Sequence, residues 1–229
     1  VVVPAAFLIR TAPVTTAPTP AKGAATTSRS TAWAAMRTPQ FIVLAITFFF
    51  CCGAHSGPIF HTVSYAMLCG ASPLAAASIY SVEGLSGLFG RLLFGVLADR
   101  FDVRRVIVGG LALQAVGIYL YIYVGQVPQF YMMALVLGLA YGGVMPLYSV
   151  LAREYFSQNV MGTVLGAASI TSFLGMALGP VGGGWLYDTF GTYHWLYIAS
   201  ASLGAVAALM ALAFPSPRRT TPPLAPLPA

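Results

Sequence analysis

Residues 90–105 read Gly90-Arg91-Leu92-Leu93-Phe94-Gly95-Val96-Leu97-Ala98-Asp99-Arg100-Phe101-Asp102-Val103-Arg104-Arg105. A long apolar run ends in this short charged stretch, and another long apolar run begins directly after it. We interpret the stretch as a hairpin at a membrane surface that joins two spanning helices.

Composition supports a membrane protein. Hydrophobic residues make up 58% of the chain and charged residues only 7%, with a mean hydropathy of +0.82, whereas soluble domains are about a quarter charged. We therefore expect a lipid bilayer as the surrounding medium. The net charge of +6 does not indicate a nucleic-acid partner, because the basic residues lie between apolar runs and form no basic face. The three cysteines have neither zinc nor disulfide spacing, and we expect no metal and no cofactor.

Six apolar segments are each long enough to cross about 30 Å of hydrocarbon as a helix. They lie at approximately residues 40–67, 73–98, 105–125, 129–151, 160–186 and 194–214. The sequence thus predicts an all-α six-helix transmembrane domain over residues 40–214. Residues 1–10 are interpreted as the end of a truncated transmembrane helix, residues 11–39 as a flexible cytoplasmic linker, and residues 215–229 as a disordered cytoplasmic tail.

The basic residues predict the orientation of this domain. Nine of them fall in the linker, in alternate loops and in the tail, and the other loops have none: Lys22, Arg29, Arg37, Arg100, Arg104, Arg105, Arg153, Arg218 and Arg219. By the positive-inside rule, both ends of the six-helix unit are expected on the cytoplasmic side.

The loop pattern Gly-x-Leu-Ala-Asp-Arg-Phe-x-x-Arg-Arg, from Gly95 to Arg105, resembles the signature loop of the major facilitator superfamily of transporters. Physically, Gly95 permits close helix approach, and Asp99 can accept hydrogen bonds from a helix N-terminus or pair with an arginine. Arg100, Arg104 and Arg105 can anchor the loop at the lipid surface. A role in fixing the membrane topology would by itself account for these three arginines. The resemblance implies a gating latch between two transporter halves. Asp102 departs from the family pattern, which usually has glycine there.

The fifth span has a second pattern, made of small residues and one proline: Gly166, Gly175, Gly179, Pro180, Gly183 and Gly184. It resembles the superfamily's glycine-proline motif associated with antiporters. Small residues at this spacing permit close helix contact, so generic packing explains the glycines equally well, and Pro180 is expected to bend the helix.

Two charges lie inside the second span. Glu83 and Arg91 are eight residues apart on one side of the expected helix, or about 12 Å along its axis. Each costs at least about 2.5–3.5 kcal/mol in a membrane. They form either a stretched structural pair or a functional site. In the site that we favour, Arg91 binds an anionic substrate, as suits a permanently charged forked donor, and Glu83 balances it or carries a proton.

The first span adds His55 and His61, on either side of a predicted helix break at Gly57–Pro58. Their spacing points them to different sides of a helix. They are either core histidines or contacts for substrate and protons. Tyr65 and Tyr141 are further candidates for lining the cavity. Tyr141–Pro146 is expected to interrupt the fourth span. Such breaks in membrane helices tend to line cavities, and a tolerated kink is the alternative at both prolines.

Several stretches resemble the bacterial monocarboxylate-transporter and oxalate/formate-antiporter branch of the superfamily: His55–His61, Gly90–Arg91, Arg153–Phe156 and Gly179–Tyr193. This resemblance implies that Arg91 matches the arginine that binds the substrate carboxylate. Span five lacks the lysine that the oxalate carrier adds, which favours a monocarboxylate.

The resemblance implies one half of a twelve-helix secondary transporter that works by alternating access in the plasma membrane, as in the bacterial inner membrane. The loop and glycine signatures are best known from the N-terminal half, but the symmetry of the two halves allows copies of both in the C-terminal half. We favour the C-terminal half, because an apolar end and a long polar linker precede the six spans. Its expected partners are a small organic anion, with protons as a further candidate, and a missing N-terminal six-helix half. The alternatives are an exporter of drugs or other small solutes, or a standalone six-helix protein that dimerises. An enzyme is not expected, because the chain has no His-Glu-x-x-His zinc motif and no paired intramembrane aspartates.

Overall fold

A computed structural model of the protein describes residues 32–215. The predictions for residues 1–10, for most of the linker and for nearly all of the tail lie outside this range. Within it, residues 32–36 are helical where a flexible linker was expected. The buried side chain of Ala32 explains this difference, because it packs against Val160 and Val164.

The described part of the chain consists of six long helices, which confirms the predicted all-α fold. They are α3 (Pro39–Leu68), α4 (Pro73–Arg100), α5 (Val103–Leu120), α6 (Val127–Tyr155), α7 (Gln158–Phe190) and α8 (His194–Leu212), with the 3-10 turn η1 (Tyr121–Tyr123) after α5. All six, with η1 continuing α5, are long and apolar enough to cross a membrane. The chain is therefore a multi-pass membrane protein.

Local sequence signals set the helix ends. The hydroxyl of Thr38 accepts a hydrogen bond from the backbone N–H of Phe41, and Ser72 caps α4 in the same way. A proline follows each cap at the first helical position, where its missing N–H costs nothing. Gly191 ends α7 with φ +67°, a conformation that glycine adopts without strain.

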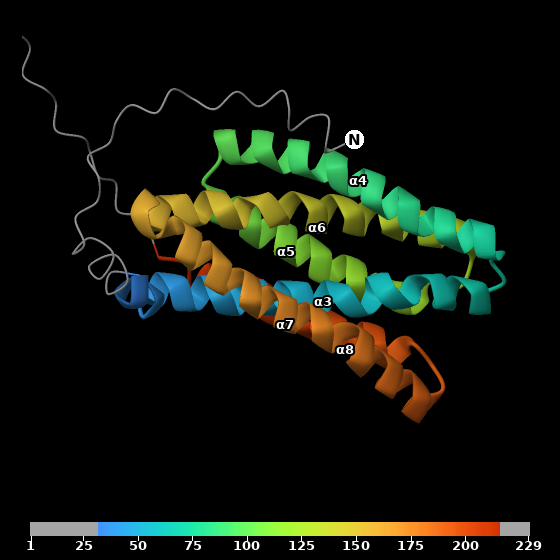
Figure 1. Ribbon diagram of the computed structural model, residues 1–229. Coiled ribbons are helices and arrows are strands. Elements are labelled where there is room, and N and C mark those ends of the chain that lie inside the picture. Colours follow the sequence, from blue (N-terminus) through green and yellow to red (C-terminus); the bar gives the residue numbers. More distant parts are fainter. Residues whose placement is uncertain (1–31, 216–229) are drawn as a thin grey trace, which may run out of the picture.

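The helices form a bundle in which α4 and α7 lie at opposite flanks (Figure 1). α4 packs mainly on α6, and α7 packs mainly on α3. Between them, α5 contacts α6 and α8, and α8 contacts α3. The flanking helices are the least covered, since only 22% and 28% of their most apolar windows are buried, against 61% in α3.

The predicted interruptions at Gly57–Pro58 and Tyr141–Pro146 do not appear, because α3 and α6 run through both prolines without a gap. α7 likewise continues through Pro180. At Gly57–Pro58, packing against neighbouring helices keeps α3 continuous. Both residues are buried, and a side chain at Gly57 would meet Ser200 of α8. Membrane helices tolerate proline when neighbouring helices support the freed backbone.

Candidate functional site

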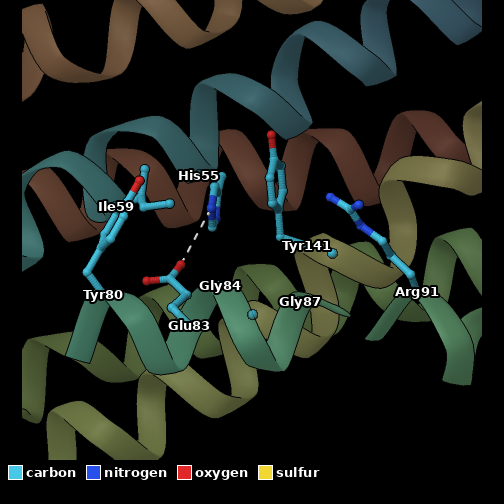
Figure 2. A pocket seen from close by; sticks show the side chains of 10 residues that line it. His55, Ile59, Tyr80, Glu83, Gly84, Gly87, Arg91 and Tyr141 are labelled. Carbon is cyan, nitrogen blue, oxygen red and sulfur yellow. Dashed lines mark ion pairs between the residues drawn. The ribbon is translucent and has the colours of Figure 1, made fainter. Parts of the chain in front are cut away.

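A cavity of about 200 Å³ lies between α3, α4 and α6 (Figure 2). Both charges of the second span line it, which places Glu83 and Arg91 on one surface. Its full lining is His55, Ile59, Tyr80, Glu83, Gly84, Gly87, Arg91, Gly138, Tyr141 and Gly142. Four of the predicted substrate contacts, His55, Glu83, Arg91 and Tyr141, are thus brought together.

Glycines set the floor of this cavity. A side chain on Gly142 of α6 would collide with the backbone of Gly87 on α4, so the two helices meet backbone to backbone. Gly138 makes a similarly close approach to the backbone of Glu83. The glycines thus form one side of the cavity, and the larger side chains form the remaining sides.

His55 and Glu83 form a buried pair inside the cavity wall. His55 Nε2 lies 3.5 Å from Glu83 Oε1, and the two side chains are 2% and 4% exposed. The ring of His55 stacks on Tyr141, with centroids 3.6 Å apart and planes within 8°. The pair therefore joins α3 to α4 while Tyr141 of α6 fixes the imidazole plane.

Arg91 lies on the other side of Tyr141 from this pair (Figure 2). Eight residues of helix separate it from Glu83, about 12 Å along α4, and no ion pair joins the two. Within residues 32–215, the recorded ion pairs are His55–Glu83 and Arg104–Asp102. The stretched Glu83–Arg91 pair considered from the sequence is therefore absent, and Arg91 presents its charge to the cavity.

His61 and Tyr65 lie outside this cavity, in an aromatic cluster with Tyr193. His61 Nε2 is 3.2 Å from the carbonyl oxygen of Pro180, and the Tyr65 hydroxyl donates to the Val124 carbonyl at 2.7 Å. The structure does not bring these two residues together with Arg91.

The charged loop differs from its expected form. α4 continues to Arg100, so Asp99 lies in its last turn, exposed and without a recorded hydrogen bond among the described residues. Asp102 instead caps α5: its Oδ1 accepts from the Arg104 backbone N–H at 2.9 Å, and Arg104 Nη2 donates to its Oδ2 at 2.7 Å. The Arg104 side chain thereby holds the pKa of Asp102 below its usual value.

Within the described chain, the N-cap of α5 is therefore Asp102 and not Asp99. Arg100 and Arg105 are exposed beside it. Gly95 is half-buried, and an added Cβ atom there would meet no atom of a neighbouring helix within 4 Å.

The glycine-proline motif of α7 divides between two faces. Gly175, Gly179 and Gly183 pack against α3, where a side chain on Gly179 would collide with Ser56 and Gly57. An added Cβ atom at Gly166 or Gly184 would meet nothing. Three glycines of the motif therefore join α3 and α7, whereas Gly166 and Gly184 face open space.

The His55–Glu83 pair was not anticipated, because its two residues are distant in sequence and lie on different helices. The eight-residue spacing of Glu83 and Arg91 identifies one face of α4, but the register of α3 against that face depends on packing. Ile59 and the α6 glycines of the cavity were missed for the same reason. In residues 32–215, no three metal-ligating side chains gather closely enough to hold an ion.

Comparison with known proteins identifies relatives. Residues 69–229 match the family profile described as Major Facilitator Superfamily. The Multidrug resistance protein B homolog of Mycobacterium tuberculosis (strain H37Rv) is 30% identical over 126 residues, which are 54% of this chain and 23% of that protein. Monocarboxylate transporter 12 of Xenopus laevis is 27% identical over 171 residues, or 71% of this chain and 36% of that protein.

Solved structures share the fold. The Escherichia coli fucose:proton symporter FucP superposes with a TM-score of 0.72 at 16% identity, over 94% of this chain and 52% of that one. The nucleoside transporter NupG gives 0.68 at 18% identity, over 80% and 47%. The chain thus spans about a quarter to a third of those two curated relatives and about half of these solved chains.

Proposed function

This chain belongs to the Major Facilitator Superfamily, and we propose that it forms one six-helix half of a secondary transporter for small organic anions. We favour the C-terminal half and a monocarboxylate substrate. Both ends of the unit would lie on the cytoplasmic side of the plasma membrane, as the arginine distribution favours.

One observation carries the substrate class: Arg91 lines a membrane-embedded cavity and has no ion-pair partner among the described carboxylates. A permanent charge in such a place is costly, and a bound anion would neutralise it. The planar guanidinium can donate two parallel hydrogen bonds to a carboxylate. Similarity to a protein named monocarboxylate transporter 12 accords with this choice.

A second six-helix half would complete the site. The cavity of about 200 Å³ is smaller than the roughly 300–1,000 Å³ typical of ligand pockets, as expected for one wall of a larger site. The open flanks of α4 and α7 would meet the other half. Transport would then proceed by rocking of the two halves around a midplane site.

Protons are the coupling ion that we propose. His55 Nε2 and Glu83 Oε1 lie 3.5 Å apart, so a proton on His55 would be balanced by the Glu83 carboxylate, and both residues line the same cavity as Arg91. Loss or gain of that proton changes the charge facing the substrate, which couples proton binding to anion binding.

The test is the variant Arg91→Ala in a transporter that contains both halves. We expect carboxylate uptake to disappear while the folded yield stays near wild type. The matched control is Arg153→Gln, which removes an exposed arginine outside the cavity and should transport normally. Unchanged uptake kinetics in Arg91→Ala would exclude a substrate role for this residue.

Export of drugs or other small solutes is the second candidate, favoured by the similarity to the multidrug resistance protein B homolog. Competition distinguishes the two candidates. In an anion carrier, small carboxylates should inhibit the uptake of labelled substrate. A drug exporter should expel neutral or cationic dyes, and small carboxylates should not affect that export. A standalone six-helix protein would have to dimerise to enclose a path, and would show activity without a second half.

A further inference from the structure

The seam between α5 and α8 carries two hollows that the proposed transport site does not use. The first lies where α5 begins and α8 ends, has a volume of about 440 Å³, and includes Arg104, Arg105 and Gly109. The second, of about 350 Å³, lies farther along the same two helices between Val116, Tyr119 and Ala205. We call them the basic hollow and the apolar hollow.

The two hollows lie on one line. Residues 109 and 116 of α5 are two helical turns apart and so share a face, about 10 Å from each other along the axis. Leu212 and Ala205 of α8 have the same spacing and line the basic and the apolar hollow respectively. Since α5 and α8 pack directly on each other, both hollows lie along the same seam between these two helices, and we call this line of two hollows the groove.

The groove has a charged end and an apolar end. Arg105 is exposed at the basic hollow, beside Arg104, which holds Asp102 at 2.7 Å. The floor of that hollow is apolar, with Ala211 1% and Phe214 5% exposed. The apolar hollow has no charged lining residue. The apolar hollow lies about 10 Å from the basic hollow along the helix axis, a distance that falls within one leaflet of a hydrocarbon core about 30 Å thick.

We propose that this groove binds one anionic phospholipid, with its phosphate at Arg105 and an acyl chain along the α5–α8 seam. A phosphate suits the arginine fork and the positive end of the α5 dipole. Only a ligand that is anionic at one end and long and apolar beyond it matches both hollows. Anionic lipid at a membrane surface attracts each nearby arginine by about 1 kcal/mol.

Native mass spectrometry of the purified chain in detergent tests this proposal, with phosphatidylglycerol, phosphatidylcholine or inorganic phosphate as the probe. We expect one phosphatidylglycerol to bind the wild type more tightly than phosphatidylcholine. Arg105→Gln should weaken phosphatidylglycerol binding about fivefold, the effect of one surface arginine, and leave phosphatidylcholine binding unchanged. The matched control Arg153→Gln should bind as the wild type does.

Gly109→Leu tests the groove itself. An added Cβ atom at Gly109 meets open space, so we expect a leucine there to occupy the basic hollow and to reduce the binding of the lipid. Gly162→Leu, at an equally open position on α7, is the control.

Equal phosphatidylglycerol binding by the wild type, Arg105→Gln and Gly109→Leu would overturn the proposal. Saturable binding of inorganic phosphate that displaces the lipid headgroup and is insensitive to Gly109→Leu would replace it with a simple anion site. A dimer that Gly109→Leu dissociates, with no lipid bound, would assign the groove to a second copy of the chain.

Discussion

The carboxyl group of Glu83 and the imidazole of His55 lie 3.5 Å apart and almost out of contact with solvent. If both groups were protonated, or both deprotonated, the pair would carry a net charge, which is costly in the membrane. With one proton between them, the pair is either an ion pair or two neutral groups, and neither leaves an uncompensated charge in the membrane. The pair therefore favours a single bound proton.

Glu83→Gln should uncouple this proton from transport. We expect anion exchange to persist, because Arg91 is untouched, while accumulation driven by a pH gradient is lost. One proton per substrate gives about tenfold accumulation per pH unit. The wild type should therefore accumulate substrate about tenfold across a gradient of one pH unit, and Glu83→Gln should not accumulate it. Labelled-substrate accumulation in proteoliposomes measures it, with His61→Gln, outside the cavity, as the control. Tenfold accumulation in Glu83→Gln would remove Glu83 from the coupling step.

Asp102 is expected to stabilise the start of α5. Loss of a helix cap costs about 1 kcal/mol, so Asp102→Ala should lower the thermal midpoint of the chain in detergent, while Asp102→Asn, which keeps an accepting oxygen, should lower it less.

The same group predicts an acid dependence. Its native pKa is depressed by the Arg104 side chain, so its charge contributes stability above the unfolded pKa of about 3.9, and that contribution is lost as pH falls through the native value. The difference in midpoint between wild type and Asp102→Asn should therefore shrink between pH 6 and pH 2. A constant difference would assign the role of Asp102 to packing and not to charge.

At the scale of helices, two pairs are held by contact between backbones: α4 with α6 at Gly87 and Gly142, and α3 with α7 at Gly53 and Gly175. In lipid, where apolar side chains gain little by leaving the solvent, such close contact is a main source of helix association. Stability in these pairs depends on the absence of side chains.

Gly142→Leu should separate α4 from α6, because a side chain there would meet the Gly87 backbone. Overpacking of a core costs about 1–3 kcal/mol, and an unyielding backbone contact places this variant at the upper end. Denaturation with increasing mole fractions of sodium dodecyl sulfate measures the loss. Gly184→Leu is the matched control, at a glycine that faces open space, and should unfold like the wild type. Equal losses in both variants would mean that helix propensity, not the close contact, is responsible.

Hydropathy predicts the six helices well, since each predicted span overlaps its helix and starts within two residues of it. Prolines mislead, because whether Pro58 or Pro146 breaks a helix depends on neighbours that lie far away in the sequence. The cap of α5 by Asp102 was likewise not anticipated, because α4 runs two residues beyond its predicted span, to Arg100. One face of the site, Glu83 and Arg91, follows from helical spacing, whereas its α3 and α6 contributions need the packed register.

At the scale of the whole molecule, α4 and α7 are the least covered helices, and the proposed second half would dock on them. Asp99 is at the end of one flank and has no recorded partner among the described residues, as expected for one side of a latch whose other side belongs to the second half.

Asp99→Asn in a transporter with both halves should therefore slow turnover more than it weakens substrate binding. Initial uptake rates give the first quantity and equilibrium binding of labelled substrate the second. Asp102→Asn, only three residues away but engaged inside this chain, should leave turnover unchanged. Identical rates in wild type and Asp99→Asn would count against a latch at this position.

Glu83 and Arg91 stand on one unbroken helix, α4, whose 28 residues form a rod about 42 Å long. A rod cannot tilt at one end only. Any tilt of α4 against α3 would lengthen the His55–Glu83 distance and at the same time change the orientation of Arg91. One rigid-body movement would therefore act on the proton-binding pair and on the anion-binding residue together. Timing between the two would then require no relay of intermediate residues, because stiffness alone would synchronise them.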